Sequence, residues 1–228
     1  MIKVDLHVHT SLSDGDDIER VTHYAKIKNL KAIAITDHDT LMSIKIAKRI
    51  KDILVIPGIE LGYDFGHILI IGINEDFKIK LNFYEMIDLC KDNGYVTILA
   101  HPAIFLLLMK NYIKRNYNKI KLLNAIEVYN SMYISFNLMK FLSEKVANVF
   151  GLTKVGGSDA HKAEYVGNCY TLLDSETSID EILQAVIKGK AHPYGFPSPL
   201  IGRLELSIKT VRHFLSTPRA RSLSMNVD

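Results

Sequence analysis

The chain has few cysteines, and the two it has follow no pattern of a disulfide framework or a zinc knuckle. Cys90 and Cys169 lie far apart in a sequence of 228 residues, and no CxxC spacing occurs. Neither a disulfide scaffold nor a structural zinc knuckle is therefore supported. We expect both cysteines to be buried thiols.

Long apolar runs are also missing. No stretch approaches the length that a helix needs to cross a bilayer. The opening segment, MIKVDLHVHT, leads directly into an expected strand and lacks the charged and apolar regions of a secretory signal. These features predict a soluble, cytoplasmic protein that contacts no membrane.

Neither sign of charge dominates the sequence. Lysine and arginine number 28 against 25 aspartates and glutamates, and the isoelectric point is near 8.7. Such a balance suits an anionic substrate but not a surface dedicated to coating nucleic acid. No internal repeat occurs, and no obligate protein partner is inferred. The tail over residues 217–228 has the composition of a weakly ordered segment, either flexible or closing a subunit contact.

Short runs rich in Ile and Val alternate with longer helical patterns, which is typical of repeated βα units. The length and the 48% of hydrophobic residues fit one buried core. We therefore predict a single α/β domain of barrel type over residues 1–216. The expected strands are 2–6, 31–36, 53–57, 67–73, 95–100, 124–128, 152–156 and 168–173. The expected helices are 17–28, 41–51, 81–92, 133–149 and 178–189, from apolar positions three and four apart.

Two helix starts are predicted from capping pairs. Asp16 and Ser178 each precede an acidic residue by three positions, Glu19 and Glu181 respectively. Residues 103–120 are ambiguous, because the run begins very apolar and turns basic. Three interpretations fit this run: a helix over the barrel mouth, an element that faces a partner, or a packed helix with a solvated basic end.

Residues able to bind a metal follow one another at the ends of the apolar runs. A barrel gathers the C-terminal ends of its strands at one mouth, so ligands far apart in sequence can meet there. Imidazole and carboxylate groups suit zinc, manganese or iron, and this set exceeds what one ion of four to six ligands can use. We therefore expect two or three divalent ions. The candidate ligands are His7, His9, Asp14, His38, Glu60, His67, His101, Asp159 and His161.

The first ligands follow the first two expected strands. His7 and His9 alternate by two residues, so their side chains point to the same side of a strand. Asp14 lies in the loop SLSDGD, where it reaches an adjacent ion or is an ordinary turn residue. His38 follows a buried strand, and its neighbour Asp37 either orients a ligand or caps the next helix.

The third, fourth and fifth runs supply Glu60, His67 and His101. Glu60 has two carboxylate oxygens and is assigned the role of a bridge between ions. His67 begins its run rather than ending it, so it is either a ligand or a hydrogen-bonded surface histidine. His101 ends its run, and Pro102 fixes the direction in which the chain leaves the strand.

The last two runs supply supporting residues and two more ligands. Glu127 and Asn130 either support ligands or, for the carboxylate, balance charge in the barrel. Asp159 and His161 follow a pair of glycines that permits an unusual turn, and their spacing of two again puts them on one side. Each motif has an ordinary structural explanation, whereas their joint occurrence at successive strand ends indicates a site.

The motifs DLHVHT with SDG, TDHDT, GIE, GH, AHP and GSDAH resemble those of the polymerase and histidinol phosphatase (PHP) family, over roughly residues 2–173. The resemblance implies a distorted (β/α)7 barrel of the TIM type, usually three metal ions, and hydrolysis of phosphate esters. It assigns His7 and His9 to a first ion, with Glu60 and Asp159 shared or adjacent. It assigns Glu60, His67 and His101 to a second ion and Asp14, His38 and His161 to a third.

The chemistry expected of such a site is attack on phosphorus by water that metal ions activate. The sequence has no GxSxG elbow, P-loop or reactive-cysteine motif, which agrees with a reaction that needs no protein nucleophile. We expect Asp14 or His161 to transfer a proton to the leaving group. We expect Lys162 or Arg203 to contact substrate phosphate.

The substrate class stays open at this stage, with a preference for a phosphodiester of a nucleotide or short oligonucleotide. Small single-domain chains that resemble this family often act on nucleotides or RNA ends. The basic residues 110–121, with Tyr112 and Tyr117 between them, either bind a short strand or form a solvated helix face. The alternatives are a phosphomonoesterase like histidinol phosphatase, a protein-tyrosine phosphatase, and a noncatalytic RNA- or polymerase-associated module.

Overall fold

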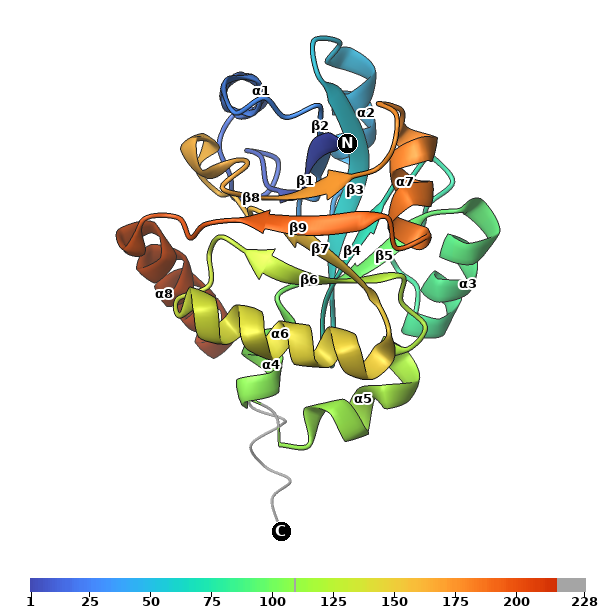
Figure 1. The fold of residues 1–228 in the computed structure, drawn as a ribbon, viewed down its shortest axis with the longest axis vertical. Helices are drawn as coiled ribbons and strands as arrows, with labels where there is room; N and C mark the ends of the chain where they lie inside the picture. The colour runs from blue at the N-terminus through green and yellow to red at the C-terminus, as the bar shows by residue number, and fades with distance from the viewer. Residues whose placement is uncertain (109, 217–228) are drawn as a thin grey trace.

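A curled sheet of nine strands forms the centre of the molecule (Figure 1). The structure is a computed structural model that describes residues 1–108 and 110–216. The strand order is β7-β6-β5-β4-β3-β2-β1-β8-β9. The strands are β1 (Ile2–Val8), β2 (Ala32–Ile35), β3 (Leu54–Tyr63), β4 (Gly66–Ile71), β5 (Val96–Leu99), β6 (Ala125–Asn130), β7 (Thr153–Gly157), β8 (Cys169–Leu173) and β9 (Ala191–Gly195).

The sheet closes into a barrel where the end of β1 meets the segment after β7. Val8 and Ala160 form a parallel bridge. The His9 N–H donates to the Ala160 carbonyl at 3.1 Å, and the Asp159 N–H donates to the His7 carbonyl at 2.8 Å. Strands β8 and β9 continue antiparallel from β1, and β9 packs back against β7. The seven strands β1–β7 therefore make a distorted barrel in one domain, as predicted.

The direction of β4 departs from the expected series of parallel βα units. β4 pairs antiparallel with both β3 and β5, and a tight turn at Asp64 and Phe65 joins it to β3 without a helix. Its first residues therefore lie at the edge of the barrel where the parallel strands end. His67, the second residue of β4, pairs with Gly62 near the end of β3.

Helices cover the outside of the barrel, and the five predicted ones are present to within a few residues. The ambiguous run 103–120 forms two helices, α4 and α5. The prediction missed β9 and α8, and the tail 217–228 lies outside the described residues. The helices are α1 (Ile18–Ile27), α2 (Met42–Arg49), α3 (Phe83–Asn93), α4 (Pro102–Leu108), α5 (Tyr112–Ile120), α6 (Phe136–Phe150), α7 (Ile179–Ile187) and α8 (Leu200–Ser216).

The two capping predictions had different outcomes. Ser178 caps α7, because its hydroxyl accepts a hydrogen bond from the Glu181 N–H at 3.3 Å. The prediction for Asp16 was wrong, because the N-cap residue of α1 is Asp17. The Asp16 carboxylate instead accepts a hydrogen bond from the Ala163 N–H at 2.9 Å, which ties the loop after β1 to the segment after His161.

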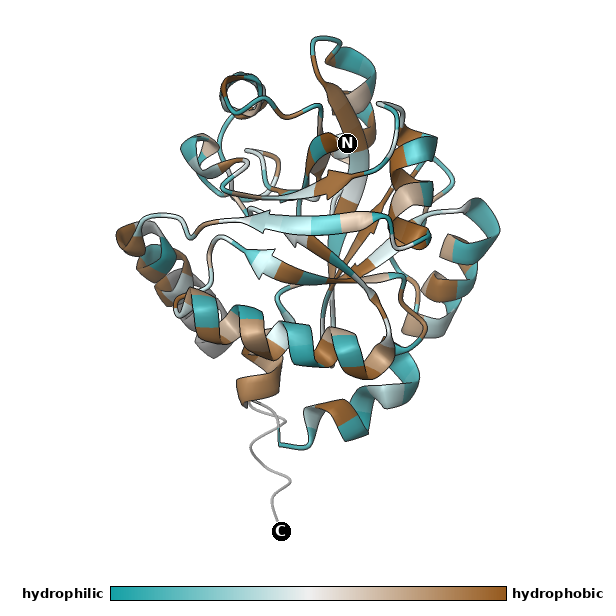
Figure 2. Cartoon of the chain, viewed as in Figure 1, coloured by the Kyte–Doolittle hydropathy of each residue, from teal (hydrophilic) through white to brown (hydrophobic). Residues whose placement is uncertain are grey.

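The core fills the barrel and the space between the barrel and its helices. Hydrophobic colouring runs along the barrel strands, whereas hydrophilic residues recur along the outer helices (Figure 2). Cys90 and Cys169 are both free and buried, as expected, and burial raises the pKa of the Cys90 thiol to about 12. None of the described helices is long and apolar enough to cross a membrane.

Candidate metal centre

The end of β1 places two imidazoles side by side in the mouth of the barrel. His7 and His9 are fully buried, and their Nε2 atoms lie 3.1 Å apart. A strand alternates its side chains with a period of two, so this arrangement is the one predicted from the HxH spacing. Two ring nitrogens that face each other at this distance can share one cation.

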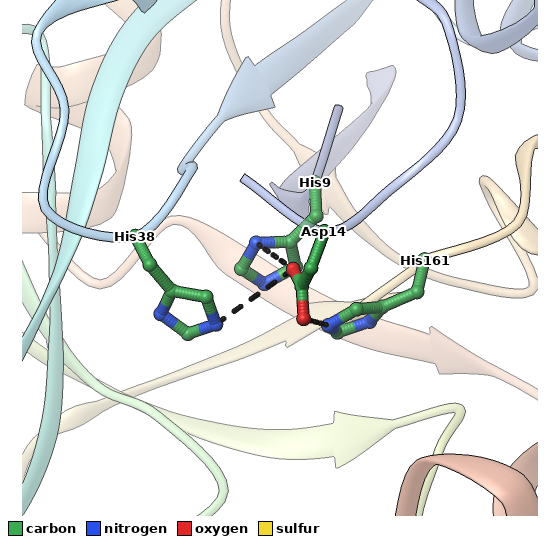
Figure 3. A group of neighbouring side chains, drawn as sticks. All are labelled: His9, Asp14, His38 and His161. Atoms are coloured by element: carbon green, nitrogen blue, oxygen red, sulfur yellow. Dashed lines mark ion pairs between the residues drawn. The ribbon is translucent and has the colours of Figure 1, made fainter. Parts of the chain in front are cut away.

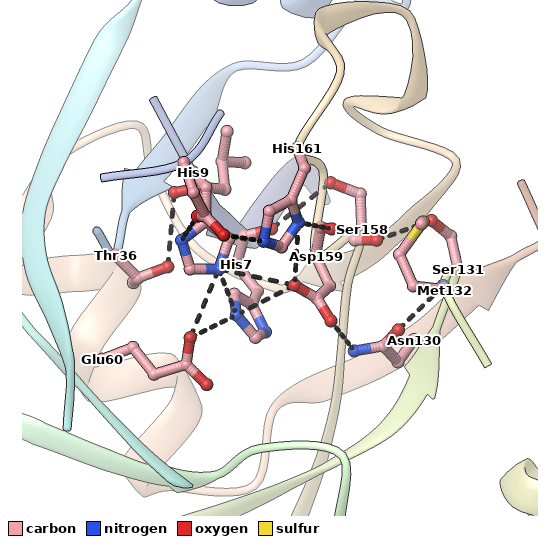
Figure 4. Close-up of polar contacts among 12 residues, drawn as sticks. His7, His9, Thr36, Glu60, Asn130, Ser131, Met132, Ser158, Asp159 and His161 are labelled. Atoms are coloured by element: carbon pink, nitrogen blue, oxygen red, sulfur yellow. Dashed lines mark hydrogen bonds and ion pairs between the residues drawn. The ribbon is translucent and has the colours of Figure 1, made fainter. Parts of the chain in front are cut away.

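Two carboxylates complete the surroundings of these nitrogens (Figure 4). Glu60 Oε2 lies 3.4 Å from His7 Nε2 and 3.3 Å from His9 Nε2. Asp159 Oδ1 lies 3.5 Å and 3.4 Å from the same two nitrogens. Ligands of a tetrahedral ion at about 2.0–2.1 Å are about 3.3–3.4 Å apart. Each carboxylate oxygen is therefore about as far from both imidazole nitrogens as two ligands of one such ion are from each other, and His7, His9 and Asp159 form one group that could hold an ion.

Glu60 lies between two groups of histidines. Its Oε1 is 2.9 Å from His67 Nδ1 and 3.2 Å from His101 Nε2. Its Oε2 faces His7 and His9, and it is also 3.3 Å from His38 Nδ1. One carboxylate thus has one oxygen toward each group, so it could hold two ions if both were bound. The antiparallel direction of β4 explains how His67 reaches this mouth from the start of its strand.

A third group surrounds Asp14 (Figure 3). Asp14 Oδ2 lies 3.2 Å from His161 Nε2, and Oδ1 lies 4.0 Å from His38 Nε2 and 3.9 Å from His9 Nδ1. His9, Asp14, His38 and His161 offer ligand atoms that all lie within 4.8 Å of one another. The structure therefore brings all nine candidate residues into one connected cluster.

Two of the candidate ligands hold an unusual backbone conformation. His101 has φ of 31° and Asp159 has φ of 54°, both in the left-handed region that residues other than glycine rarely adopt. Such conformations persist where the surrounding structure fixes them, and they occur most often at functional sites. The sequence gives no indication of this strain at either residue.

Hydrogen bonds from Glu127 and Asn130, which are not candidate ligands themselves, orient several of the ligands. Glu127 Oε1 lies 3.0 Å from His7 Nδ1, so this nitrogen carries the proton and Nε2 is left for a metal. Glu127 Oε2 accepts from the His101 N–H at 2.9 Å, and Asn130 Nδ2 donates to both Glu127 and Asp159. Both residues therefore support ligands, which was the role predicted for Asn130 and one of the two predicted for Glu127.

Asp37 also supports the site rather than capping a helix. Its carboxylate accepts hydrogen bonds from the Thr10 N–H at 2.7 Å, the Thr10 hydroxyl at 2.6 Å and the Ser13 hydroxyl at 2.6 Å. The N-cap residue of α2 is Leu41, so Asp37 has no capping role there. Asp37 thus fixes the loop that carries Asp14.

Sequence reasoning missed Asp5. This carboxylate is fully buried and accepts hydrogen bonds from the backbone N–H groups of His7, Ser158 and Gly167, at 3.3, 2.9 and 2.7 Å. Burial raises its pKa to about 6, against the opposing effect of these bonds. The alternation Asp5, His7, His9 along one strand was the signal that predicts its inward direction.

The cluster has the properties of a site that takes up cations. Burial by itself raises the pKa of the Glu60 carboxyl, but the charges of His7 and His67 and hydrogen bonds from His101 and His67 hold that pKa well below its usual range. The buried Nδ1 atoms of His9 and His101 have no hydrogen-bond partner among the described residues. Ionised carboxylates together with unpartnered imidazole nitrogens fit divalent ions that take mixed N and O ligands.

Gly157 is expected to be intolerant of a side chain. A Cβ at this position would lie 2.5 Å from His7 Cβ and 2.8 Å from Glu127 Oε1. We expect Gly157→Ala to lower the free energy of unfolding by about 1–3 kcal/mol, as overpacking does, and to weaken metal binding by displacing His7. Denaturant unfolding and metal titration measure the two effects. Gly94→Ala is the control for metal binding alone: its φ of 71° makes alanine unfavourable, but no atom lies within 4 Å of the added Cβ, and metal binding should stay intact.

Of the two residues expected to contact phosphate, Lys162 lies in the segment after β7 and Arg203 lies on α8. Lys162 follows His161, is half-exposed, and pairs with Glu205 of α8 at 2.7 Å. Arg203 Nη1 donates to the carbonyls of Tyr133 and Ile134 at 2.9 and 2.7 Å. In the structure both cations therefore link α8 to loops near the mouth.

Comparison with known families gives matches over most of the chain. A family model described as PHP domain matches residues 5–163, and one described as PHP-associated matches residues 140–191. An uncharacterised protein of Methanocaldococcus jannaschii is 29% identical over 188 residues, which cover 79% of this chain and 73% of the relative. A phosphoribosyl 1,2-cyclic phosphate 1,2-diphosphodiesterase of Eggerthella lenta is 38% identical over 81 residues, 31% of each chain.

Solved structures share the fold at lower sequence identity. A two-domain protein of Bacteroides vulgatus that contains a predicted PHP-like metal-dependent phosphoesterase has a TM-score of 0.67 at 19% identity, covering 86% of this chain and 65% of its own. PsfC of Pseudomonas syringae has the same TM-score and identity, covering 93% and 98%. These similarities support the barrel architecture.

Proposed function

Because the chain belongs to the PHP domain family, we propose that it is a metal-dependent hydrolase that cleaves a phosphodiester of a nucleotide or short oligonucleotide. The observation that carries the hydrolase assignment is the position of Glu60, with one oxygen toward His67 and His101 and the other toward His7, His9 and His38. Such a bridge has a clear use in a site for more than one ion and none in a simple barrel core.

Divalent ions bound in this cluster would lower the pKa of water and neutralise charge on the phosphate oxygens. His161 Nδ1 lies 3.0 Å from the Asp159 carbonyl, which can only accept, so this nitrogen carries a proton. Its Nε2 lies 3.2 Å from Asp14 Oδ2, so a proton shared between these two atoms is the one that could pass to the leaving group. We assign Asp14 or His161 the transfer of a proton to the leaving group.

Two observations support a diester over a monoester. The Eggerthella lenta relative is a diesterase by name, and its matching segment makes up 31% of this chain. In addition, α4 and α5 lie at the rim of the mouth. The ring centroids of Phe105 on α4 and His67 are 5.8 Å apart, and the hydroxyl of Tyr112 on α5 donates to the Phe65 carbonyl at 2.9 Å. A rim with exposed basic residues suits the further phosphates of a strand better than a small monoester.

Lys162 and Arg203 are proposed to contact substrate phosphate. The Lys162 ion pair with Glu205 is at the surface, where water and salt weaken such pairs, so exchange of Glu205 for phosphate costs little. Arg203 already donates to two carbonyls, and it would contact phosphate while holding them. Unchanged kcat/KM in both Lys162→Ala and Arg203→Ala would refute these assignments.

The proposal is tested with protein reconstituted with manganese and a short 5′-phosphorylated oligoribonucleotide. We expect mononucleotides to be released in a reaction that EDTA abolishes. Free phosphate as the product would instead identify a phosphomonoesterase. Absence of any reaction, with metal bound, would favour a noncatalytic module, and His9→Ala would then fold and bind its partner as the wild type does.

Residues exposed on α5 are expected to contribute to binding of longer substrates. Lys114 and Arg115 are both exposed there. Replacing both with alanine should raise KM for an oligonucleotide and leave KM for a dinucleotide unchanged. It should also reduce the dependence of log KM on log salt concentration by about 1.4, since each contact with a single strand contributes about 0.7.

The matched control removes two exposed lysines from the far edge of the barrel. Lys188 and Lys190 flank Gly189, which lies beside Thr153 at the start of β7, opposite the mouth. Their double alanine variant should match the wild type with both substrates. Equal effects of the two double variants would show that α5 acts only through net charge.

A further inference from the structure

The segment just before α8 is built into the wall of the metal centre. Ser198 is 1% exposed and lies beyond both ranges that the family models match. Its N–H donates to the Ser131 carbonyl at 2.8 Å, and its hydroxyl lies 2.8 Å from the Ser131 hydroxyl. Ser131 follows β6 directly, next to Asn130, so this segment is bonded to the loop that supports the ligands.

The hydrogen bonds of Ser198 form a chain with one direction. The single hydroxyl proton of Ser131 is donated to the Ser158 carbonyl at 2.6 Å, so the Ser198 hydroxyl must donate to Ser131. Asn168 Nδ2 in turn donates to Ser198 at 2.9 Å, and Lys28 donates to Asn168 Oδ1 at 2.7 Å. Each bond in such a chain polarises the next, so all of them favour the final contact with the Ser158 carbonyl.

That final contact fixes the peptide group that precedes Asp159. Ser131 binds the carbonyl of this group, and the His7 carbonyl binds its N–H at 2.8 Å. The orientation of the peptide group sets the φ angle of Asp159, which is 54°. An aspartate keeps a left-handed backbone conformation only where the surrounding structure fixes it. Its carboxylate then lies 3.5 and 3.4 Å from the Nε2 atoms of His7 and His9.

We propose that Ser198 is a positioning residue that holds Asp159 in its ligand conformation through Ser131. The C-terminal segment thereby sets the affinity of the metal position formed by His7, His9 and Asp159. The inference rests on the metal dependence in the proposed function and is independent of the substrate. Loss of the Ser198 hydroxyl lets the peptide group rotate and moves the Asp159 carboxylate away from the two imidazoles.

The test is a titration of the full, metal-free chain with Zn²⁺ in competition with a chromophoric chelator. Ser198→Ala should bind one metal equivalent about 10- to 100-fold more weakly, the loss typical when a group that orients a ligand is removed, and bind the others normally. Ser198→Thr, which keeps the hydroxyl, should restore the affinity. Ser131→Ala should show the same loss, and the double variant no further loss, because both residues act through one chain.

Ser143→Ala is the matched control. Ser143 is also fully buried, and its hydroxyl lies 2.9 Å from the Tyr133 hydroxyl rather than in the Ser198 chain. The metal affinity of Ser143→Ala should equal that of the wild type. Normal affinity in Ser198→Ala, or an equal loss in Ser143→Ala, would overturn the inference and leave the phosphoesterase proposal standing. If Ser198→Ala does not fold, Ser131→Ala decides, whereas a wild type that binds no ion would refute both proposals.

Discussion

Glu60→Gln is expected to remove nearly all turnover and to lower the number of bound ions. The amide keeps the shape of the side chain but loses the charge that faces five imidazoles, from His7, His9, His38, His67 and His101. A catalytic ion contributes several kcal/mol of charge stabilisation in the transition state. At about 1.4 kcal/mol per factor of ten, kcat/KM should fall roughly 10³-fold.

Metal content and kcat/KM are measured on the same preparation of this variant. Glu176→Gln is the control, because Glu176 is exposed and follows the end of β8 that pairs with the start of β1, away from the end that carries His7 and His9, and it should behave as the wild type. Normal metal content together with normal turnover in Glu60→Gln would show that this carboxylate bridges no ions.

Removal of metal is expected to lower the melting temperature and to abolish hydrolysis. The cluster buries two carboxylates, Glu60 and Asp159, whose pKa values are lowered by neighbouring histidines, so bound ions supply charge compensation to the folded state. One site at a free metal concentration of 100 times Kd stabilises the fold by about 2.7 kcal/mol. For a chain of this size that corresponds to a rise in Tm of about 5–10 °C.

Thermal melts after EDTA dialysis, with and without added Mn²⁺, measure this effect. His9→Ala is the informative comparison, because it removes a ligand shared by two groups of the cluster, and its Tm should rise less when metal is added. Identical melting temperatures of the wild type with and without metal would contradict tight binding at this site.

The order of the ligands along the chain was predictable because strand periodicity and strand ends follow from local sequence. His7 and His9 share a side because a strand alternates with a period of two. His67 was harder to place, because the sequence does not reveal that β4 runs antiparallel to its neighbours. Once that direction is known, the start of β4 must lie beside the ends of the other strands.

Other features depend on tertiary contacts and could not be predicted. The left-handed backbone of His101 and Asp159 is imposed by partners distant in sequence, such as Glu127 and Ser131. The helix α8 carries no capping pair of the kind that marks α7. Its place is set by bonds from Arg203 and Ser198 to the loop after β6.

The seam of the barrel has a consequence for how the protein acquires metal. The backbone bonds that close the barrel join His7 to Asp159 and His9 to Ala160, so they join β1 to a segment about 150 residues later. Contacts of such long sequence separation form slowly, because a large loop must close first. A chain whose synthesis has not yet reached Asp159 contains His7 and His9 but cannot form the bonds that close the barrel. Tight metal binding by His7, His9 and Asp159 would therefore follow closure of the barrel.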